Sequence, residues 1–197
     1  MLVGRGDEGE SAVRSTADDD RRLIARIVRR DLRALEELYR GYHPRLTRFL
    51  ASLTRRAEIV EEVLNDTMLV VWTAPEKYNG ASKVSTWIFA IAYRKALKAL
   101  RRQPEPMEDR EDDHRVSPDM GPEQVLGQRQ VSQVLLAAMA RLSPDHRAVV
   151  DLTYFHEIGY REIAEIMGCP VDTVKTRMFH ARRHLKGMLA GRLGDWL

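Results

Sequence analysis

A stretch rich in proline and acidic residues, 103–124, divides this chain into two parts and limits what it can fold into. Its helix-breaking residues are Pro104, Pro106, Pro118, Gly121 and Pro122. No helix can run through them, because proline lacks a backbone N–H donor and clashes with the preceding turn. We therefore expect an acidic flexible linker at 103–124 between two small domains, 21–102 and 125–197, with a disordered tail at 1–20.

Apolar residues recur at helical spacing on both sides of this linker, which predicts an all-α fold. In the first domain they predict an apolar helix face over 32–42 and a new helix with Pro44 in its first turn. A third helix is expected at about 57–72 and a fourth at about 85–102, separated by a loop at 75–80. A chain of 197 residues with 44% apolar residues can bury cores of this size.

The second domain carries the strongest local pattern of the chain. Ser143 and Pro144 predict the start of a helix. A short helix at 160–167, a turn at Gly168 and a basic helix from Cys169-Pro170 to about Ala190 then form a helix-turn-helix pattern. Its expected buried stripe is Ile163, Ala164, Met167, Val171, Val174, Met178, Ala181, Leu185 and Met188.

The side of the last helix opposite this stripe is polar and basic. A helix that reads the major groove needs short polar or basic side chains for base edges and basic neighbours for phosphates. The candidates for these contacts are Lys175, Thr176, Phe179, His180, Arg182 and Arg183. Spacing alone leaves a second interpretation open, an ordinary amphipathic helix with a solvated basic face.

The loop before the fourth helix and that helix itself combine aromatic, amide and basic groups. The residues concerned are Tyr78, Asn79, Lys83, Trp87, Arg94 and Lys98. Single-stranded nucleic acid binds such surfaces, because bases stack on rings while cations hold phosphates. Tyr78 and Trp87 are equally compatible with core packing.

The third helix has an acidic side at Glu58, Glu61, Glu62, Asn65 and Asp66. Such a side is often only solvated, but it can also dock the basic groups of a partner. Two basic parts joined by an acidic linker, with a net charge of +3, indicate a polyanionic partner.

Several function classes lack support in the sequence. There is no glycine-rich phosphate loop, nucleophile elbow or His-Glu-x-x-His pair, so we expect neither an enzyme nor a cofactor. His180 and His184 lie four residues apart but lack a third ligand, and the single cysteine, Cys169, excludes a disulfide framework, so no metal site is expected. No secretory signal or membrane span is visible, which predicts a cytoplasmic protein.

Four segments resemble one family of bacterial transcription factors. EEVLNDTMLVVW (61–72), STWIFAIAYRKALKALRR (85–102), LSPDHRAVVDLTYFHEIGYREIAEIMG (142–168) and CPVDTVKTRMFHARRHL (169–185) are similar to regions two and four of extracytoplasmic-function (ECF) sigma factors, in the sigma-70 family. The order of the two regions across such a linker makes the resemblance specific.

The resemblance implies a sigma factor that directs core RNA polymerase to promoters, in response to stress and under an anti-sigma factor. Glu61, Glu62, Asn65 and Asp66 would bind the β′ clamp helices of the polymerase. The loop at 78–84 and the fourth helix would melt and read the −10 element as single strands. The last helix would read the −35 duplex, and its domain would touch the β flap.

Two alternatives stay open at this point. A stand-alone helix-turn-helix repressor or activator explains the second domain but not the first, and a small helical enzyme lacks a site.

Overall fold

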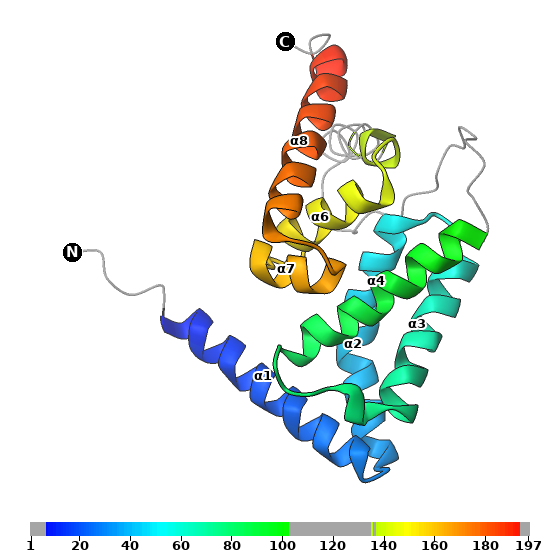
Figure 1. The fold of residues 1–197 in the computed structure, drawn as a ribbon, viewed down its shortest axis with the longest axis vertical. Coiled ribbons are helices and arrows are strands. Elements are labelled where there is room, and N and C mark those ends of the chain that lie inside the picture. Colours follow the sequence, from blue (N-terminus) through cyan, green and yellow to red (C-terminus); the bar gives the residue numbers. More distant parts are fainter. Residues whose placement is uncertain (1–6, 103–134, 136, 194–197) are drawn as a thin grey trace, which may run out of the picture.

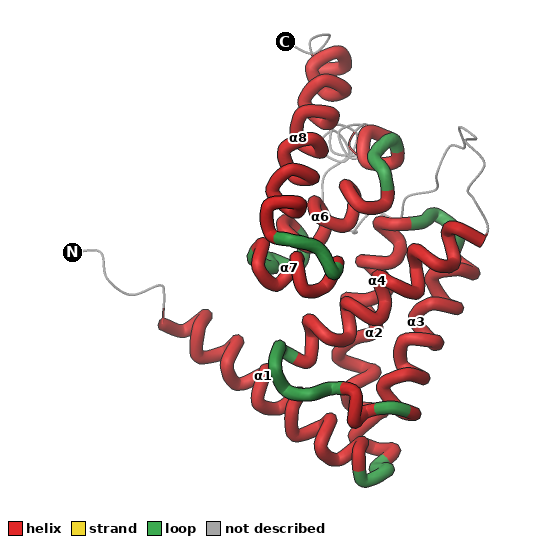
Figure 2. Tube along the Cα trace, in the orientation of Figure 1, coloured by secondary structure: helices red, strands yellow, loops and turns green. Residues whose placement is uncertain are grey.

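The computed structural model describes residues 7–102, 135 and 137–193 (Figure 1). Within these residues the regular elements are all helical, as Figure 2 shows, so the all-α prediction is confirmed. The elements are α1 (Asp7–Val28), α2 (Leu32–Leu53), α3 (Ala57–Thr73), the 3-10 helix η1 (Pro75–Lys77), α4 (Val84–Arg102), α6 (Pro144–Tyr154), α7 (Tyr160–Met167) and α8 (Val171–Leu193). The expected linker at 103–124 lies outside the described residues.

Helix α1 corrects the expectation of a disordered tail over residues 7–20, because the helix begins at Asp7, while residues 1–6 lie outside the described part of the chain. Its last turns are anchored to the body, since Leu23, Ile24 and Ile27 are buried and the Tyr42 hydroxyl donates a hydrogen bond to Asp20. Once such a nucleus is docked, each further residue adds one backbone hydrogen bond at little cost, so the helix can extend toward the N-terminus. The apolar periodicity that predicts helices covers only the docked part of α1, so it does not reveal the rest of the helix.

Helix α2 is also longer than predicted, because it runs through Pro44 without a break. The Asp31 side chain caps it by accepting hydrogen bonds from the backbone N–H groups of Arg33 and Ala34. A proline inside a helix costs about 3 kcal/mol. Burial of Tyr42 and Leu46 on either side of Pro44 offsets this cost, and Pro44 itself is exposed, so its ring faces water.

Helices α3 and α4 complete the first module, the bundle α1–α4. The observed α3 and α4 lie within one residue of the predicted ranges at each end. The short helix η1 and the loop after it connect them, and Gly80 has a φ of +76°, which favours glycine.

The second module, α6–α8, contains the predicted helix-turn-helix. Ser143 caps α6 as expected, since its hydroxyl accepts from the backbone N–H of His146. Gly168 ends α7 with a φ of +63°, the left-handed conformation that a tight turn between two helices requires. Ile163, Val174, Met178 and Ala181 are buried, so this part of the predicted stripe is confirmed.

The two modules pack directly on each other. Helix α7 lies against α4 and helix α6 against α2, while α1 reaches away from the body toward the N-terminus (Figure 1). Buried residues of both modules belong to one continuous cluster, which runs from Leu23 in α1 to Ala181 in α8. The described chain therefore has a single core shared by two modules.

Candidate nucleic-acid and polymerase interfaces

The acidic face of α3 comprises Glu61, Glu62, Asn65 and Asp66. Glu61, Glu62 and Asn65 are exposed, because α3 buries its opposite side against α2 and α4. Asp66 differs from these three, since it accepts a hydrogen bond of 2.8 Å from Lys95 of α4. Three of the four predicted residues are therefore open to a partner, while the fourth is tied to the bundle.

The loop at 78–83 is held in one shape by its own hydrogen bonds. The Tyr78 hydroxyl donates to the carbonyl of Ser82 at 2.7 Å, and the Asn79 side-chain oxygen accepts from the backbone N–H of Ala81 at 3.0 Å. The Tyr78 ring lies 5.5 Å from the Trp87 ring, centroid to centroid. A hollow of about 500 Å³ lies between this loop and α1, and Arg21, Ile24 and Tyr78 are among its lining residues.

Helix α4 displays the other predicted residues of the first module. Arg94 and Lys98 are exposed and Trp87 is half-buried, and all three lie on the same side of the helix. Lys83 is not free, because its ammonium group forms an ion pair of 3.0 Å with Glu162 of the second module. The structure thus brings Tyr78, Asn79 and Trp87 together and turns Lys83 toward α7.

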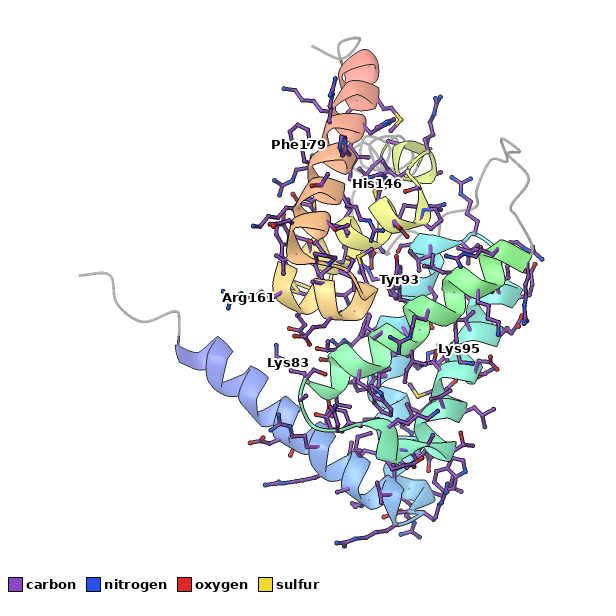
Figure 3. All side chains as sticks on the ribbon, viewed as in Figure 1. Lys83, Tyr93, Lys95, His146, Arg161 and Phe179 are labelled. Carbon is purple, nitrogen blue, oxygen red and sulfur yellow. The ribbon has the colours of Figure 1, made fainter. Side chains whose placement is uncertain are left out.

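The outer face of α8 presents most of the side chains that were predicted to read duplex DNA. Lys175, Thr176, His180 and Arg183 are exposed, and Phe179 is 62% exposed, which is unusual for a large aromatic side chain (Figure 3). Thr176 donates a hydrogen bond to the carbonyl of Asp172, and Lys175 pairs with the Asp172 carboxylate at 3.0 Å.

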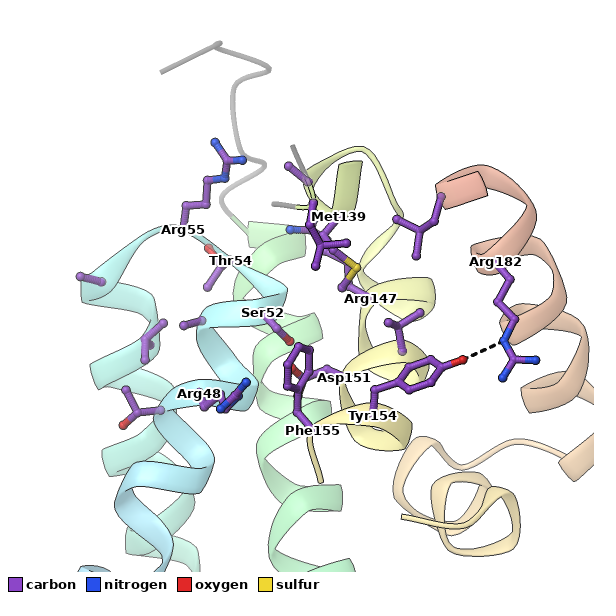
Figure 4. A pocket seen from close by; sticks show the side chains of 18 of the residues that line it. Arg48, Ser52, Thr54, Arg55, Met139, Arg147, Asp151, Tyr154, Phe155 and Arg182 are labelled. Atoms are coloured by element: carbon purple, nitrogen blue, oxygen red, sulfur yellow. Dashed lines mark hydrogen bonds between the residues drawn. The ribbon is translucent and has the colours of Figure 1, made fainter. Parts of the chain in front are cut away.

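Arg182 does not share this outer face. Its Nε donates to the Tyr154 hydroxyl at 3.0 Å, and its guanidinium lies 5.7 Å from the centre of the Tyr154 ring (Figure 4). Arg182 therefore points back toward α6 and away from the groups on the outer face.

His146 connects α6 to the outer face of α8. Its ring lies 6.4 Å from that of His180, and its Nδ1 lies 2.8 Å from the Ser143 hydroxyl. Burial lowers the pKa of His146, and the charges of His180 and Arg177 lower it further. A neutral His146 is thus favoured beside a basic helix.

A groove of about 1240 Å³ is lined by residues of α2, α3, α6 and α8 (Figure 4). Its lining is apolar, with Val60, Met139 and Leu189 among its residues, and Arg48, Arg55 and Lys186 contribute positive charge. The Arg48 guanidinium lies 4.2 Å from the centre of the Phe155 ring, so one cation crosses from α2 to the end of α6.

Further polar groups, which were not predicted as site residues, join the two modules. Tyr93 of α4 donates to Asp145 of α6 at 2.7 Å, and Asp145 also pairs with Arg177 of α8. Thr86 of α4 donates to Glu162 at 2.6 Å. Thr86 and Tyr93 are seven residues apart in a largely apolar helix, a spacing that places them on one face and was available in the sequence as a signal.

His156, just after the end of α6, lies in this interface. Its ring lies edge-on to Phe89 at 4.9 Å and to Phe49 at 6.2 Å. Its Nε2 lies 3.2 Å from the Asp151 carboxylate, and both side chains are almost fully buried. Burial raises the pKa of Asp151, although the neighbouring His156 acts in the opposite direction.

Other kinds of site are not visible in the described part of the chain. No cluster of three histidine, cysteine, aspartate or glutamate side chains there could hold a metal ion. Among the same residues, no helix is long and apolar enough to cross a membrane. Cys169 is half-buried in the turn, where its sulfur lies 3.7 Å from Arg177.

Comparisons with known proteins match both modules. Residues 38–104 match the family described as Sigma-70 region 2, and residues 132–185 match Sigma-70, region 4. The chain is 34% identical over 154 residues to the ECF RNA polymerase sigma factor RpoE of Cereibacter sphaeroides, a match that covers 76% of this chain and 82% of the relative.

Two solved structures share the fold. One is that of CnrH in complex with the cytosolic domain of CnrY, with a TM-score of 0.64, 22% identity, and coverage of 88% of this chain and 98% of that chain. The other is RpoE of Bartonella quintana in complex with the anti-sigma factor NepR, with a TM-score of 0.61, 23% identity, and coverage of 78% and 95%.

The chain therefore belongs to the sigma-70 family, with a region 2 module and a region 4 module on one polypeptide. Within that family it is an ECF sigma factor, an RNA polymerase subunit for promoter-specific transcription initiation. The alternative of a stand-alone repressor or activator is not favoured, because such a regulator has no use for a region 2 module.

Proposed function

We propose that the surfaces described above divide promoter recognition between the two modules. The acidic face of α3 binds core polymerase, the loop at 78–84 with α4 contacts the −10 element, and the outer face of α8 contacts the −35 duplex. The observation that carries this proposal is that two separate surfaces lie on different modules of one chain: Arg94 and Lys98 are exposed beside the half-buried rings of Tyr78 and Trp87 on the first, and exposed basic residues surround the exposed Phe179 on the second.

The hollow beside the loop supports a role in promoter melting. It is bordered by the Tyr78 ring and the Arg21 side chain, which suit a flipped base and its phosphate. Extruding a base costs a few kcal/mol, and stacking on an aromatic ring returns about 1–3 kcal/mol per base. Ion pairs with phosphates from Arg94 and Lys98, both exposed, supply the remainder.

The outer face of α8 supports duplex recognition in the major groove. Thr176, in the second turn of α8, and His180, one turn further along, are exposed, so they can reach base edges, while Phe179 offers an apolar surface to thymine methyl groups. Lys175 and Arg183 flank them and can hold phosphates. We assign no phosphate contact to Arg182, because it is bonded to Tyr154.

The groove between the modules is the surface that suits an anti-sigma factor. Its apolar lining fits the apolar side of a helix, and Arg48 and Lys186 at its rim fit acidic side chains on that helix. A solved relative of the same fold is in complex with an anti-sigma factor. We propose that this chain is controlled in the same way, as a non-catalytic factor that acts in the cytoplasm, where its polymerase is found.

Reconstituted transcription tests the −10 assignment. We expect holoenzyme with Tyr78→Ala and Asn79→Ala to bind core normally but to fail in permanganate footprinting of the −10 bubble. Tyr78→Phe keeps the ring and should retain melting, and Lys77→Ala, an exposed neighbour, is the matched control. Normal melting by the double variant would show that the loop is not a base pocket.

A further inference from the structure

Two of the polar contacts between the modules meet on one carboxylate. Glu162, in the first turn of α7, pairs with the Lys83 ammonium group at 3.0 Å and accepts a hydrogen bond of 2.6 Å from the Thr86 hydroxyl. Lys83 and Thr86 stand at the end of the loop and the start of α4, the part of the first module assigned above to the −10 element. Glu162 is largely covered, with 20% of its side chain exposed, whereas Lys83 is 52% exposed.

This contact resembles one between a protein and a nucleic-acid backbone, with the Glu162 carboxylate in the place of the phosphate. An ammonium group and a hydroxyl that donate to one anionic group form the donor set that commonly binds a phosphate oxygen. The Lys83 ammonium group, paired in this way, is already engaged by an anion of the same chain. A DNA phosphate and Glu162 therefore compete for the same two donors.

The surroundings of Glu162 make the contact part of a packed interface. On the first module Phe49 and Phe89 receive the His156 ring, and on the second Ile158 and Ile163 are buried nearby in the shared core. Tyr93 and Asp145 add a third polar contact farther along α4. The closed arrangement thus combines apolar packing with polar contacts, and Glu162 lies at its edge next to the loop (Figure 3 shows Lys83 directed toward α7).

The dimensions of a promoter require this arrangement to open. Two elements centred about 25 base pairs apart lie roughly 85 Å apart, at about 3.4 Å per base pair. A compact chain of 197 residues is roughly 40 Å across, on the usual scaling of size with length. The modules cannot stay packed together and occupy both elements at once.

We propose that Glu162 is an internal substitute for a promoter phosphate. Its carboxylate binds Lys83 and Thr86 and thereby helps to hold the DNA-free chain closed. This inference rests on the proposed role of the loop at 78–84 in DNA contact. Separation of the modules on core polymerase breaks the contact and releases both donors to the promoter. Because apparent affinity scales with the open fraction, weakening the contact raises DNA binding by the free chain in proportion.

The test compares the full-length chain with Glu162→Gln and, as a control, Glu165→Gln. Glu165 is an exposed residue of the same helix, so its change removes the same charge without touching Lys83. The probe is a fluorescent single-stranded 12-nucleotide DNA of random sequence, followed by anisotropy, and small-angle scattering reports the spacing of the modules. We expect about tenfold tighter binding and a larger radius of gyration for Glu162→Gln alone. Equal gains in both variants, or no gain in either, would overturn the proposal.

A second pair of variants separates this inference from the proposed function. Lys83→Ala combined with Glu162→Gln should lose the gain in DNA binding but keep the larger radius. If Lys83→Ala alone leaves both DNA binding and promoter melting by holoenzyme unchanged, the role of the loop in DNA contact is wrong. If Lys83→Ala impairs melting but Glu162→Gln changes neither affinity nor radius, the role of the loop stands and the contact with Glu162 is not inhibitory.

Discussion

We expect charge reversal on the acidic face of α3 to weaken binding to core polymerase, and the structure shows which residues of this face can be changed without disturbing the fold. Glu61 and Glu62 are exposed, whereas Asp66 is bonded to Lys95. Reversal of Asp66 would place a lysine beside Lys95 and disturb the bundle. A loss of polymerase affinity in that variant could then come from impaired folding as well as from impaired binding. The informative variant is Glu61→Lys with Glu62→Lys.

The expected loss of affinity follows from Coulomb's law. An exposed charge about 5 Å from an opposite charge gains about 0.8 kcal/mol in water, and reversing it changes the energy by twice that amount. Two reversals therefore cost about 3 kcal/mol, which is a loss of roughly 150-fold in affinity for core polymerase. The free energy of unfolding should change by less than about 0.5 kcal/mol per residue, because both side chains are at the surface.

The assay is competition for core polymerase against a labelled wild-type chain, with thermal unfolding measured in parallel. Glu76→Lys with Glu165→Lys is the control, since it changes net charge equally at two other exposed positions. Affinity within threefold of wild type would refute the assignment of this face. An equal loss in the control would show that net charge alone is responsible.

Three further predictions concern the second module. Among promoters with a randomised −35 element, His180→Ala should relax preference at one or two positions by about 1–3 kcal/mol, whereas Arg183→Ala should weaken all sequences alike and reduce the salt dependence of binding; the opposite pattern would mean that the outer face of α8 is wrongly assigned. Arg182→Ala should lower the free energy of unfolding by about 1 kcal/mol in chemical denaturation, through the lost bond to Tyr154, and leave −35 preference unchanged. Because the pKa of His146 is lowered in the folded chain, its contribution to stability is present above about pH 6.5 and lost as the pH falls below it, so His146→Gln should flatten the decline in stability between about pH 7 and pH 5.

The sequence predicts well those features that depend on local signals. Ser143 before Pro144 and Gly168 after a short amphipathic helix are cap residues, and caps act within a few residues of chain. The buried stripe of α8 follows from helical periodicity in the same way, and Val174, Met178 and Ala181 are buried as predicted. The single-residue roles at the two DNA-facing surfaces stay predictions until the variants above are measured.

Features that depend on contacts between distant residues were missed or predicted wrongly. Pro44 was predicted to stand in the first turn of a new helix, but α2 continues through it, with packing on both sides. The bond between Tyr42 and Asp20 and the pair of Lys83 with Glu162 span 22 and 79 residues, and no local pattern marks such partners. The ring contacts of His156 are of the same kind, because its neighbours, Phe49 and Phe89, belong to the other module.

The core shared by the two modules has a consequence for how the chain is made. The first module leaves the ribosome before α6–α8 exist, so the apolar surface around Phe49 and Phe89 that later receives His156 stays in water during synthesis. That surface is an aggregation hazard for the nascent chain until the second module arrives. Truncated chains that stop before α6 should accordingly depend on chaperones for solubility far more than the complete chain does.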